Sequence, residues 1–250
     1  MSAIETLLAV IPARGGSKGL PGKNVKSFAG LPLIAHTILF AKMCPEITRC
    51  IVSTDAPEIA DVAKHFGADV PFVRPSALAR DETSLWLVLR HALAEVEQQE
   101  GARYDALLLL DPTSPAREPS DIAGSLRRWA ERPEADGVIG VSRPDFSPIW
   151  HCVVERDGWM INLDEQGARY ERRQEVPPVY RINGSLYLWR ADFVRSQGRE
   201  TWRQTGRHLL YEIPESRAMS IDTAEQFDRA ELLVKGGLIT FPWLSESRVR

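Results

Sequence analysis

The chain has 250 residues and a formal net charge of −3, which suits one α/β domain over residues 1–250 and gives no sign of a nucleic-acid-binding surface. Hydrophobic residues make up 44% of it, enough for a core, yet no apolar run approaches the roughly 20 residues that span a bilayer. We therefore expect neither nucleic acid nor a membrane as a partner. Cys44, Cys50 and Cys152 lack the spacing of a zinc site or a disulfide scaffold, which favours reduced thiols and a cytoplasmic protein.

Apolar runs alternate with amphipathic stretches along the first half of the chain. Buried strands are predicted at Leu7–Pro12, Cys50–Ser53, Ala106–Leu110 and Gly137–Val141. Helices are predicted at Leu33–Met43, Pro57–Phe66, Ser84–Gln98 and Ile122–Trp129. Ser120 is in position to cap the last of these helices. This rhythm predicts an α/β fold with a doubly wound, mostly parallel sheet, as in Rossmann-like proteins.

The rhythm changes after Ser142, where strands follow one another without long helices between them. These strands are predicted at His151–Val154, Trp159–Ile161 and Ser185–Trp189. Residues from about 143 to 182 are predicted to form a small inserted arm outside the main sheet. The arm carries Trp150 and Trp159, so it is a candidate dimerisation element. A closing helix is predicted at Thr223–Val234, with Asp222 at its cap position.

The segment Ile11–Asn24 (IPARGGSKGLPGKN) follows the first strand directly. It contains four glycines, among them Gly15 and Gly16, and three cations, Arg14, Lys18 and Lys23. Glycines let backbone N–H groups turn inward around an anion, and the cations can neutralise a triphosphate. The P-loop and dinucleotide-binding motifs are both absent. The alternative is an ordinary surface loop, but this density of glycines and cations favours a nucleoside triphosphate site.

The same segment resembles the signature of the acylneuraminate (nonulosonic acid) cytidylyltransferases, which make CMP-activated sialic acids. Further motifs follow in the family's order over nearly the whole chain. They are VSTD (Val52–Asp55), FVRPSALARD (Phe72–Asp81), DPTSPAR (Asp111–Arg117), YRINGSLY (Tyr180–Tyr187) and SIDT (Ser220–Thr223). The resemblance implies a nucleotide-diphospho-sugar transferase-like fold. It also implies a reaction of CTP with a sialic, legionaminic or related nine-carbon sugar acid that releases pyrophosphate.

The resemblance places the nucleotide on the glycine-rich segment and on two later motifs. Arg14 and Lys23 are implied to bind the triphosphate and to act in catalysis, with Lys18 near the leaving pyrophosphate. The other positions implied to contact the nucleotide are Gly15, Gly16, Asn24, Arg74, Thr83, Ser84 and Asp111. A surface salt bridge is the alternative explanation of Arg74.

The sugar substrate carries a carboxylate, which arginine binds through a planar two-pronged contact. Arg173, also implied to be catalytic, and Arg181 fall where the family places arginines near the sugar and the reacting phosphates. Arg172 adjoins Arg173, so the match allows a slip by one residue. Asn183 and Tyr187 match family residues beside the sugar, although Tyr187 is equally well explained as a core aromatic.

Mg²⁺ is the implied cofactor, held by one or two carboxylates against phosphate oxygens. Asp222 resembles one of the family's metal-site aspartates, although its position also suits a helix cap. Relatives often read D-I-D-T where this chain has Ser220, so one carboxylate is missing. They often have glutamine in place of Asp111. Asp111 either alters contacts to the nucleotide or the sugar, or restores the missing metal ligand.

A third departure is Trp150, which stands where some relatives have a lysine. Together the three departures favour a sugar other than N-acetylneuraminate, such as a legionaminic- or pseudaminic-type acid. Because family members are commonly dimers, we expect a homodimer built on the arm.

Two alternatives stay open. The first is a nucleotidyltransferase for another nucleotide or sugar acid, such as GTP or an eight-carbon keto acid. The second is a catalytically weak, nucleotide-binding regulatory protein, suggested by the loss at Ser220.

Overall fold

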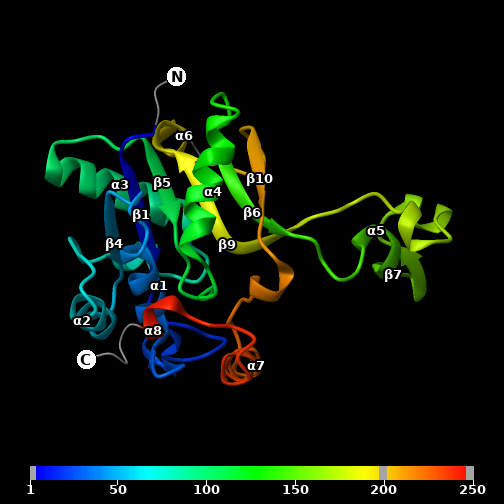
Figure 1. Cartoon of the computed structure of the whole chain (residues 1–250), viewed down its shortest axis with the longest axis horizontal. Helices are drawn as coiled ribbons and strands as arrows, with labels where there is room; N and C mark the ends of the chain where they lie inside the picture. The colour runs from blue at the N-terminus through cyan, green and yellow to red at the C-terminus, as the bar shows by residue number, and fades with distance from the viewer. Residues whose placement is uncertain (1–3, 197–201, 246–250) are drawn as a thin grey trace.

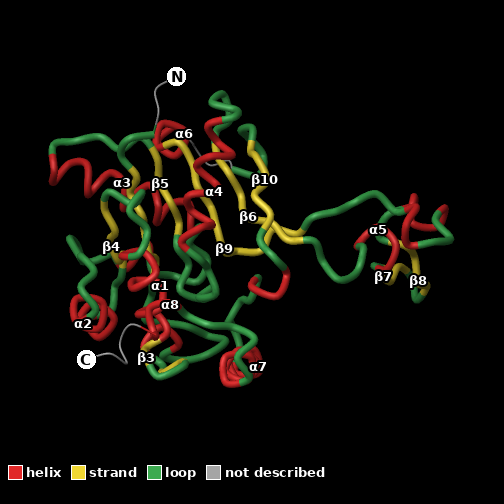
Figure 2. Tube along the Cα trace, viewed as in Figure 1, coloured by secondary structure: helices red, strands yellow, loops and turns green. Residues whose placement is uncertain are grey.

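A six-stranded sheet forms the centre of the molecule in the computed structural model, which describes residues 4–196 and 202–245 (Figures 1 and 2). The strands lie across it in the order β10 (His208–Glu212), β6 (Gly137–Ser142), β9 (Arg181–Arg190), β5 (Ala106–Leu109), β1 (Leu7–Pro12) and β4 (Arg49–Ser53). The neighbours β1–β4, β1–β5 and β10–β6 are parallel, whereas β9 runs antiparallel to β5 and β6. The predicted mostly parallel sheet is confirmed.

Helices cover both faces of this sheet. They are α1 (Leu33–Lys42), α2 (Pro57–His65), α3 (Leu85–Glu100), α4 (Pro119–Ala130), α6 (Ala191–Ser196) and α7 (Ala224–Lys235), while α8 (Pro242–Ser245) packs against α1 and the short helix α5 (Pro148–His151) lies away from the sheet. Leu7, Ala9 and Ile11 of β1 pack in one core cluster with α1, α2, α4 and α7, while Leu8 and Val10 pack in a second with α3 and α6. Successive residues of a strand point to opposite faces, so β1 is buried on both sides and reads as a continuous apolar run.

Three local predictions were wrong. Glu118, not Ser120, caps α4, because Pro119 occupies the first turn and Asp121 completes a capping box. Thr223, not Asp222, caps α7, again with a capping box, here completed by Gln226. His151 ends the short helix α5 instead of beginning a strand. Three strands were not predicted: β10 and the short pair β2 (Ser27–Phe28) and β3 (Leu31–Pro32).

An arm projects from the sheet between β6 and β9 (Figure 1). It contains α5, the hairpin of β7 (Val153–Arg156) and β8 (Trp159–Asn162), and two 3₁₀ turns, η3 (Glu165–Arg169) and η4 (Arg173–Glu175). Gly158 has a φ of 80° in the hairpin turn, a conformation that glycine adopts without strain. Ser142 at the end of β6 pairs with Arg181 at the start of β9, so the arm leaves and rejoins the sheet at one place.

Within residues 4–196 and 202–245, no helix combines the length and the apolar character needed to cross a bilayer. Cys44, Cys50 and Cys152 are free thiols. Burial raises the pKa of Cys44 and of Cys50 to about 12, so both are protonated and poorly nucleophilic at neutral pH.

His36 is fully buried in α1 and joins α8 to the core. The indole Nε1 of Trp243 donates to His36 Nδ1 at 3.1 Å. Indole is only a donor, so Nε2 of His36 carries the ring proton and donates to the Phe28 carbonyl at 2.8 Å. Burial lowers the pKa of His36 to about 4, outweighing the Phe28 hydrogen bond, which raises it.

Acid should therefore destabilise the fold through His36. A folded-state pKa below the unfolded value means that the unfolded chain binds the proton more readily, so stability falls as pH drops from about 6.5 towards 4. We expect a loss of about 2 kcal/mol between pH 7.5 and pH 5, measured by urea unfolding. His36→Asn should be less stable at pH 7.5 but should lack this slope. An equal slope in the variant would assign the effect to other groups.

Candidate active site

The glycine-rich segment leaves the carboxyl end of β1 and folds back on itself. Gly22, with a φ of 65°, starts the turn η1 (Lys23–Val25), which buries Lys23 and Asn24. Asn24 Nδ2 donates to the Arg14 carbonyl at 3.2 Å and ties the two ends of the segment together. A Cβ at Gly19 would lie 2.3 Å from the carbonyl oxygen of Asp222, so only glycine lets the segment pass this close to that residue.

One pocket collects most residues predicted to contact the nucleotide, and we call it the loop pocket. Its lining includes Arg14, Lys23, Asn24, Arg74 and Thr83. Arg74 is buried, and its Nε donates to Ser53 Oγ at 3.1 Å. Burial lowers its pKa to about 10, which leaves it charged at neutral pH. The structure therefore does not support the alternative that Arg74 is a surface salt bridge.

The remaining nucleotide candidates lie around this pocket. The Gly15 N–H donates to Asp55 Oδ1 at 3.1 Å, and an added Cβ at Gly16 would meet open space. The carboxylate of Asp81 forms ion pairs with both Arg14 and Lys18. Sequence reasoning assigned no role to Asp81, although it closes the FVRPSALARD motif.

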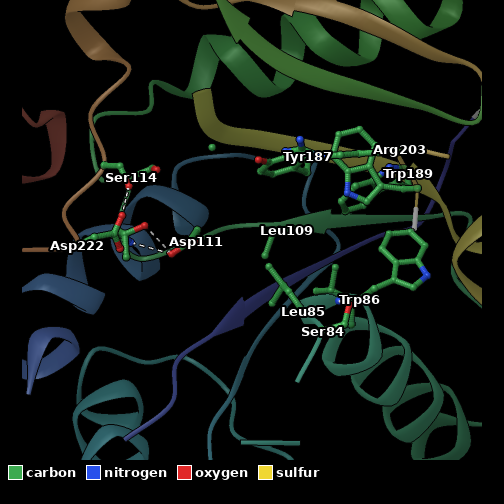
Figure 3. A pocket seen from close by; sticks show the side chains of 15 residues that line it. Ser84, Leu85, Trp86, Leu109, Asp111, Ser114, Tyr187, Trp189, Arg203 and Asp222 are labelled. Carbon is green, nitrogen blue, oxygen red and sulfur yellow. Dashed lines mark hydrogen bonds between the residues drawn. The ribbon is translucent and has the colours of Figure 1, made fainter. Parts of the chain in front are cut away.

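A second pocket adjoins the first, and we call it the aromatic pocket. Trp86, Tyr187, Trp189 and Trp202 contribute to its lining (Figure 3). The ring centroids of Trp86 and Trp189 are 4.9 Å apart, and Tyr187 stacks on Trp189 at 5.6 Å. Tyr187 thus both lines a pocket and packs in an aromatic cluster, so the structure is compatible with a residue beside the sugar and with a core aromatic.

Other predicted residues meet the aromatic pocket only at its edge or not at all. Ser84 lines it and also caps α3, accepting from the Trp86 N–H at 3.3 Å. Asn183 does not line it, because its Nδ2 donates to Ser142 Oγ at 2.9 Å within the sheet. The structure gives Asn183 a role in holding β6 to β9.

The two pockets share a junction that carries both candidate metal-binding carboxylates, Asp111 and Asp222. Figure 3 shows these two side chains at one end of the aromatic pocket and the indole rings at the other. Oδ1 of Asp111 accepts from the Thr113 N–H at 3.0 Å and from its hydroxyl at 2.9 Å. The junction is where a ligand in one pocket would meet a ligand in the other.

Asp222 is held at this junction by two donors. Lys23 Nζ donates to Oδ1 at 2.8 Å, and Ser220 Oγ donates to Oδ2 at 2.7 Å. Burial favours a higher pKa for Asp222, but the hydrogen bonds from Lys23 and Ser220 outweigh it and hold the pKa below its usual range. Ser220, where relatives often carry a carboxylate, thus orients Asp222 without adding charge.

The two arginines predicted to contact the sugar lie outside both pockets. Arg181 Nε donates to Glu215 Oε1 at 2.9 Å, and its Nη2 donates to the Ala218 carbonyl at 2.9 Å. It therefore anchors the segment that leads to Ser220. Arg173 is exposed and begins η4 on the arm. Trp150 also lies on the arm, in α5.

A model of the cytidylyltransferase family matches residues 8–239. The chain belongs to this family. A CMP-N,N'-diacetyllegionaminic acid synthase from Legionella pneumophila is 35% identical, covering 92% of this chain and 96% of the relative. A post-translational flagellin modification protein B from Campylobacter coli is 31% identical, covering 93% of this chain and 96% of the relative. The family indicated by the motifs is therefore confirmed, and the protein is a nucleotidyltransferase.

The fold of this cytidylyltransferase also occurs in a solved structure of a CMP:2-keto-3-deoxy-manno-octonic acid synthetase complexed with CTP. The TM-score is 0.70 at 20% identity, and the match covers 93% of this chain and 99% of the other. This likeness confirms the predicted nucleotide-diphospho-sugar transferase-like architecture.

A buried arginine to which the sequence analysis gave no role, Arg117, supports the junction of the two pockets. Arg117 Nη2 donates to the Asp111 carbonyl at 2.6 Å, and its Nε donates to the Ser185 carbonyl. Burial lowers its pKa to about 10. Arg117 thereby fixes the backbone of Asp111 against β9. The sequence feature that could have identified Arg117 is its position as the last residue of the DPTSPAR motif.

Proposed function

We propose that this cytidylyltransferase activates an acidic nine-carbon sugar with CTP, giving the CMP-sugar and pyrophosphate. The observation that carries the proposal is the pair of adjoining pockets. One is lined by Arg14, Lys23 and Arg74, the other by aromatic rings, and they meet at Asp111 and Asp222. Such a reaction needs a polyphosphate site beside a sugar site, with the reacting atoms at their junction.

In this proposal the triphosphate lies in the loop pocket and the sugar in the aromatic pocket. The anomeric hydroxyl oxygen forms a bond to the α-phosphorus as the bond from that phosphorus to the bridging oxygen of pyrophosphate breaks. The hydroxyl proton leaves to solvent or to a neighbouring base. Lys23 and Arg14 are placed to neutralise the charge that develops on the phosphates, and Asn24 holds the segment in shape for this task.

We propose that Mg²⁺ assists the reaction and that Asp111 and Asp222 hold it. Their carboxylate oxygens are hard ligands, and both line the junction. The described residues contain no group of three or more His, Cys, Asp or Glu side chains suited to a metal. Two carboxylates fit Mg²⁺, which keeps several waters and takes its other ligands from substrate phosphates. When bound, Mg²⁺ would neutralise phosphate charge.

The aromatic pocket supports a legionaminic-type acid as the sugar. Indole and phenol rings favour apolar groups such as the methyls of acylamido substituents, and less so a row of free hydroxyls. The Legionella relative is named for an acid with two acetyl groups. At Ser220 and Trp150 this chain also differs from the residues that relatives often have. These differences favour a sugar other than N-acetylneuraminate.

A substrate screen tests the proposal directly. CTP, UTP, ATP and GTP are each combined with N,N'-diacetyllegionaminic, pseudaminic, N-acetylneuraminic and eight-carbon keto acids, and pyrophosphate release is measured. We expect CTP with the diacetylated acid to be fastest. Activity with GTP or the eight-carbon acid alone would support the first alternative. CTP binding without pyrophosphate release on any sugar would support the regulatory alternative.

We also propose a cytoplasmic homodimer, in which the arm contacts a second copy. Trp159 and Met160 at the tip of the hairpin are 75% and 77% exposed, unusually high for large apolar side chains. The three free thiols support a reducing compartment. If the dimer forms, replacing both tip residues with serine should halve the mass measured by light scattering.

A further inference from the structure

Asp81 is the only carboxylate in the described part of the chain whose ion pairs take up two cations of the glycine-rich segment at once. One carboxylate oxygen pairs with Arg14 and the other with Lys18. Lys23, the third cation, pairs instead with Asp222 at the junction. The cations proposed to bind the triphosphate are thus divided between two acidic residues.

The position of Asp81 makes it easy to displace. It lies on the surface segment between the turn η2 (Ser76–Leu78) and α3, and its side chain is 35% exposed. Hydrogen bonds from Lys18 and Arg14 hold its pKa below the usual range, so it is charged at neutral pH. Ion pairs this exposed contribute little to stability and exchange readily for a stronger anion.

A polyphosphate in the loop pocket would compete with this carboxylate. Asp81 and Arg14 both line this pocket, and Lys18 is held beside it by its ion pair with Asp81. Two anions sharing the same cations at short range repel each other. Asp81 must therefore leave when a polyphosphate enters, and it is available to return when one departs.

We propose that Asp81 is an internal counter-ion for the phosphate-binding cations, which CTP displaces and which returns as pyrophosphate leaves. The inference rests on the proposed function, since it needs the loop pocket to bind polyphosphate. In this role Asp81 weakens the binding of CTP and pyrophosphate at equilibrium. In exchange it speeds the release of pyrophosphate, because the cations are neutralised again as the product departs.

The test compares Asp81→Asn with Glu82→Gln in the full chain. Glu82 is its exposed neighbour on the same segment, so both changes remove one negative charge from the same place. Inorganic pyrophosphate and CTP are titrated into each protein by calorimetry at fixed Mg²⁺. We expect Asp81→Asn to bind pyrophosphate about three- to tenfold tighter than wild type, and Glu82→Gln to change binding less than about twofold. Asp81→Ala should match Asp81→Asn.

Three results would overturn the inference. Equal tightening in Glu82→Gln would mean a general effect of charge. Unchanged affinity in Asp81→Asn would mean that the ion pairs do not compete with phosphate. Weaker affinity with a higher Mg²⁺ requirement would make Asp81 a metal ligand. If the loop pocket does not bind polyphosphate at all, the result is different, because wild type itself would then bind neither CTP nor pyrophosphate.

Discussion

Replacing Asp222 with asparagine should lower the rate of pyrophosphate release by about 10²–10³-fold at saturating substrates. The side chain keeps its size, but the junction loses the charge that Lys23 neutralises and that Mg²⁺ is proposed to need. The rate is measured over a wide range of Mg²⁺ concentration. We expect the variant to need more Mg²⁺ for half-maximal rate and to reach a lower plateau.

Two companion variants show which part of the junction matters. Ser220→Ala removes the hydrogen bond to Asp222 without changing charge, so we expect less than about a tenfold loss. Asp111→Asn should raise the Mg²⁺ requirement if Asp111 replaces the carboxylate missing at position 220. An unchanged requirement in Asp111→Asn would leave Asp222 as the single protein ligand. An unchanged rate in Asp222→Asn would remove the metal proposal altogether.

Arg173→Ala should lower kcat/KM for the sugar acid by about 10²-fold, because an arginine facing a carboxylate makes charge-assisted hydrogen bonds. Arg173 is on the projecting arm and lines neither pocket of its own chain. If it acts on the sugar, it must do so in the pocket of a second copy. Each active site would then contain residues from two chains, with Arg173 supplied by the partner copy.

Mixing two variants with impaired sites separates this arrangement from a role within one chain. Arg173→Ala and Arg14→Ala are unfolded together, refolded and assayed. Half of the dimers would be mixed, each with one intact site, so about a quarter of wild-type activity should return. Arg172→Ala is the matched control for the neighbouring position, whose guanidinium is already paired with Glu175. No recovery on mixing would contradict a shared site.

Much of the fold follows from local pattern alone. Strands buried on both faces, such as β1, give unbroken apolar runs, and amphipathic helices give the spacing seen in α3. The missed elements lack those signals. β10 is a half-exposed edge strand of five residues, and its apolar run, Leu209–Tyr211, is only three residues long. The antiparallel direction of β9 is set by where the arm returns, which no local pattern encodes.

The candidate site was harder, because its key contacts join distant segments. Lys23 and Asp222 were each proposed from motifs, but their pairing brings together residues from opposite ends of the chain. Asp222 was wrongly predicted to cap α7, because aspartate and threonine are both good caps. Thr223 is the cap because Gln226, three residues later, completes a capping box with it. Asp81 was named only as the last residue of the FVRPSALARD motif, because one acid in a polar segment gives no sign of its ion pairs with Arg14 and Lys18.

Because the arm leaves and rejoins the sheet at one point, its length and sequence can vary without disturbing the sheet. Since Ser142 and Arg181 are already paired, residues 143–180 can lengthen, shorten or be exchanged without altering the register of β6 and β9. Mutations in the arm therefore leave unchanged the strands that carry Tyr187 and support Asp111. A chimera that carries a relative's arm is therefore expected to keep the fold of the sheet, and if the arm forms the proposed dimer contact, it should pair with the donor's partner.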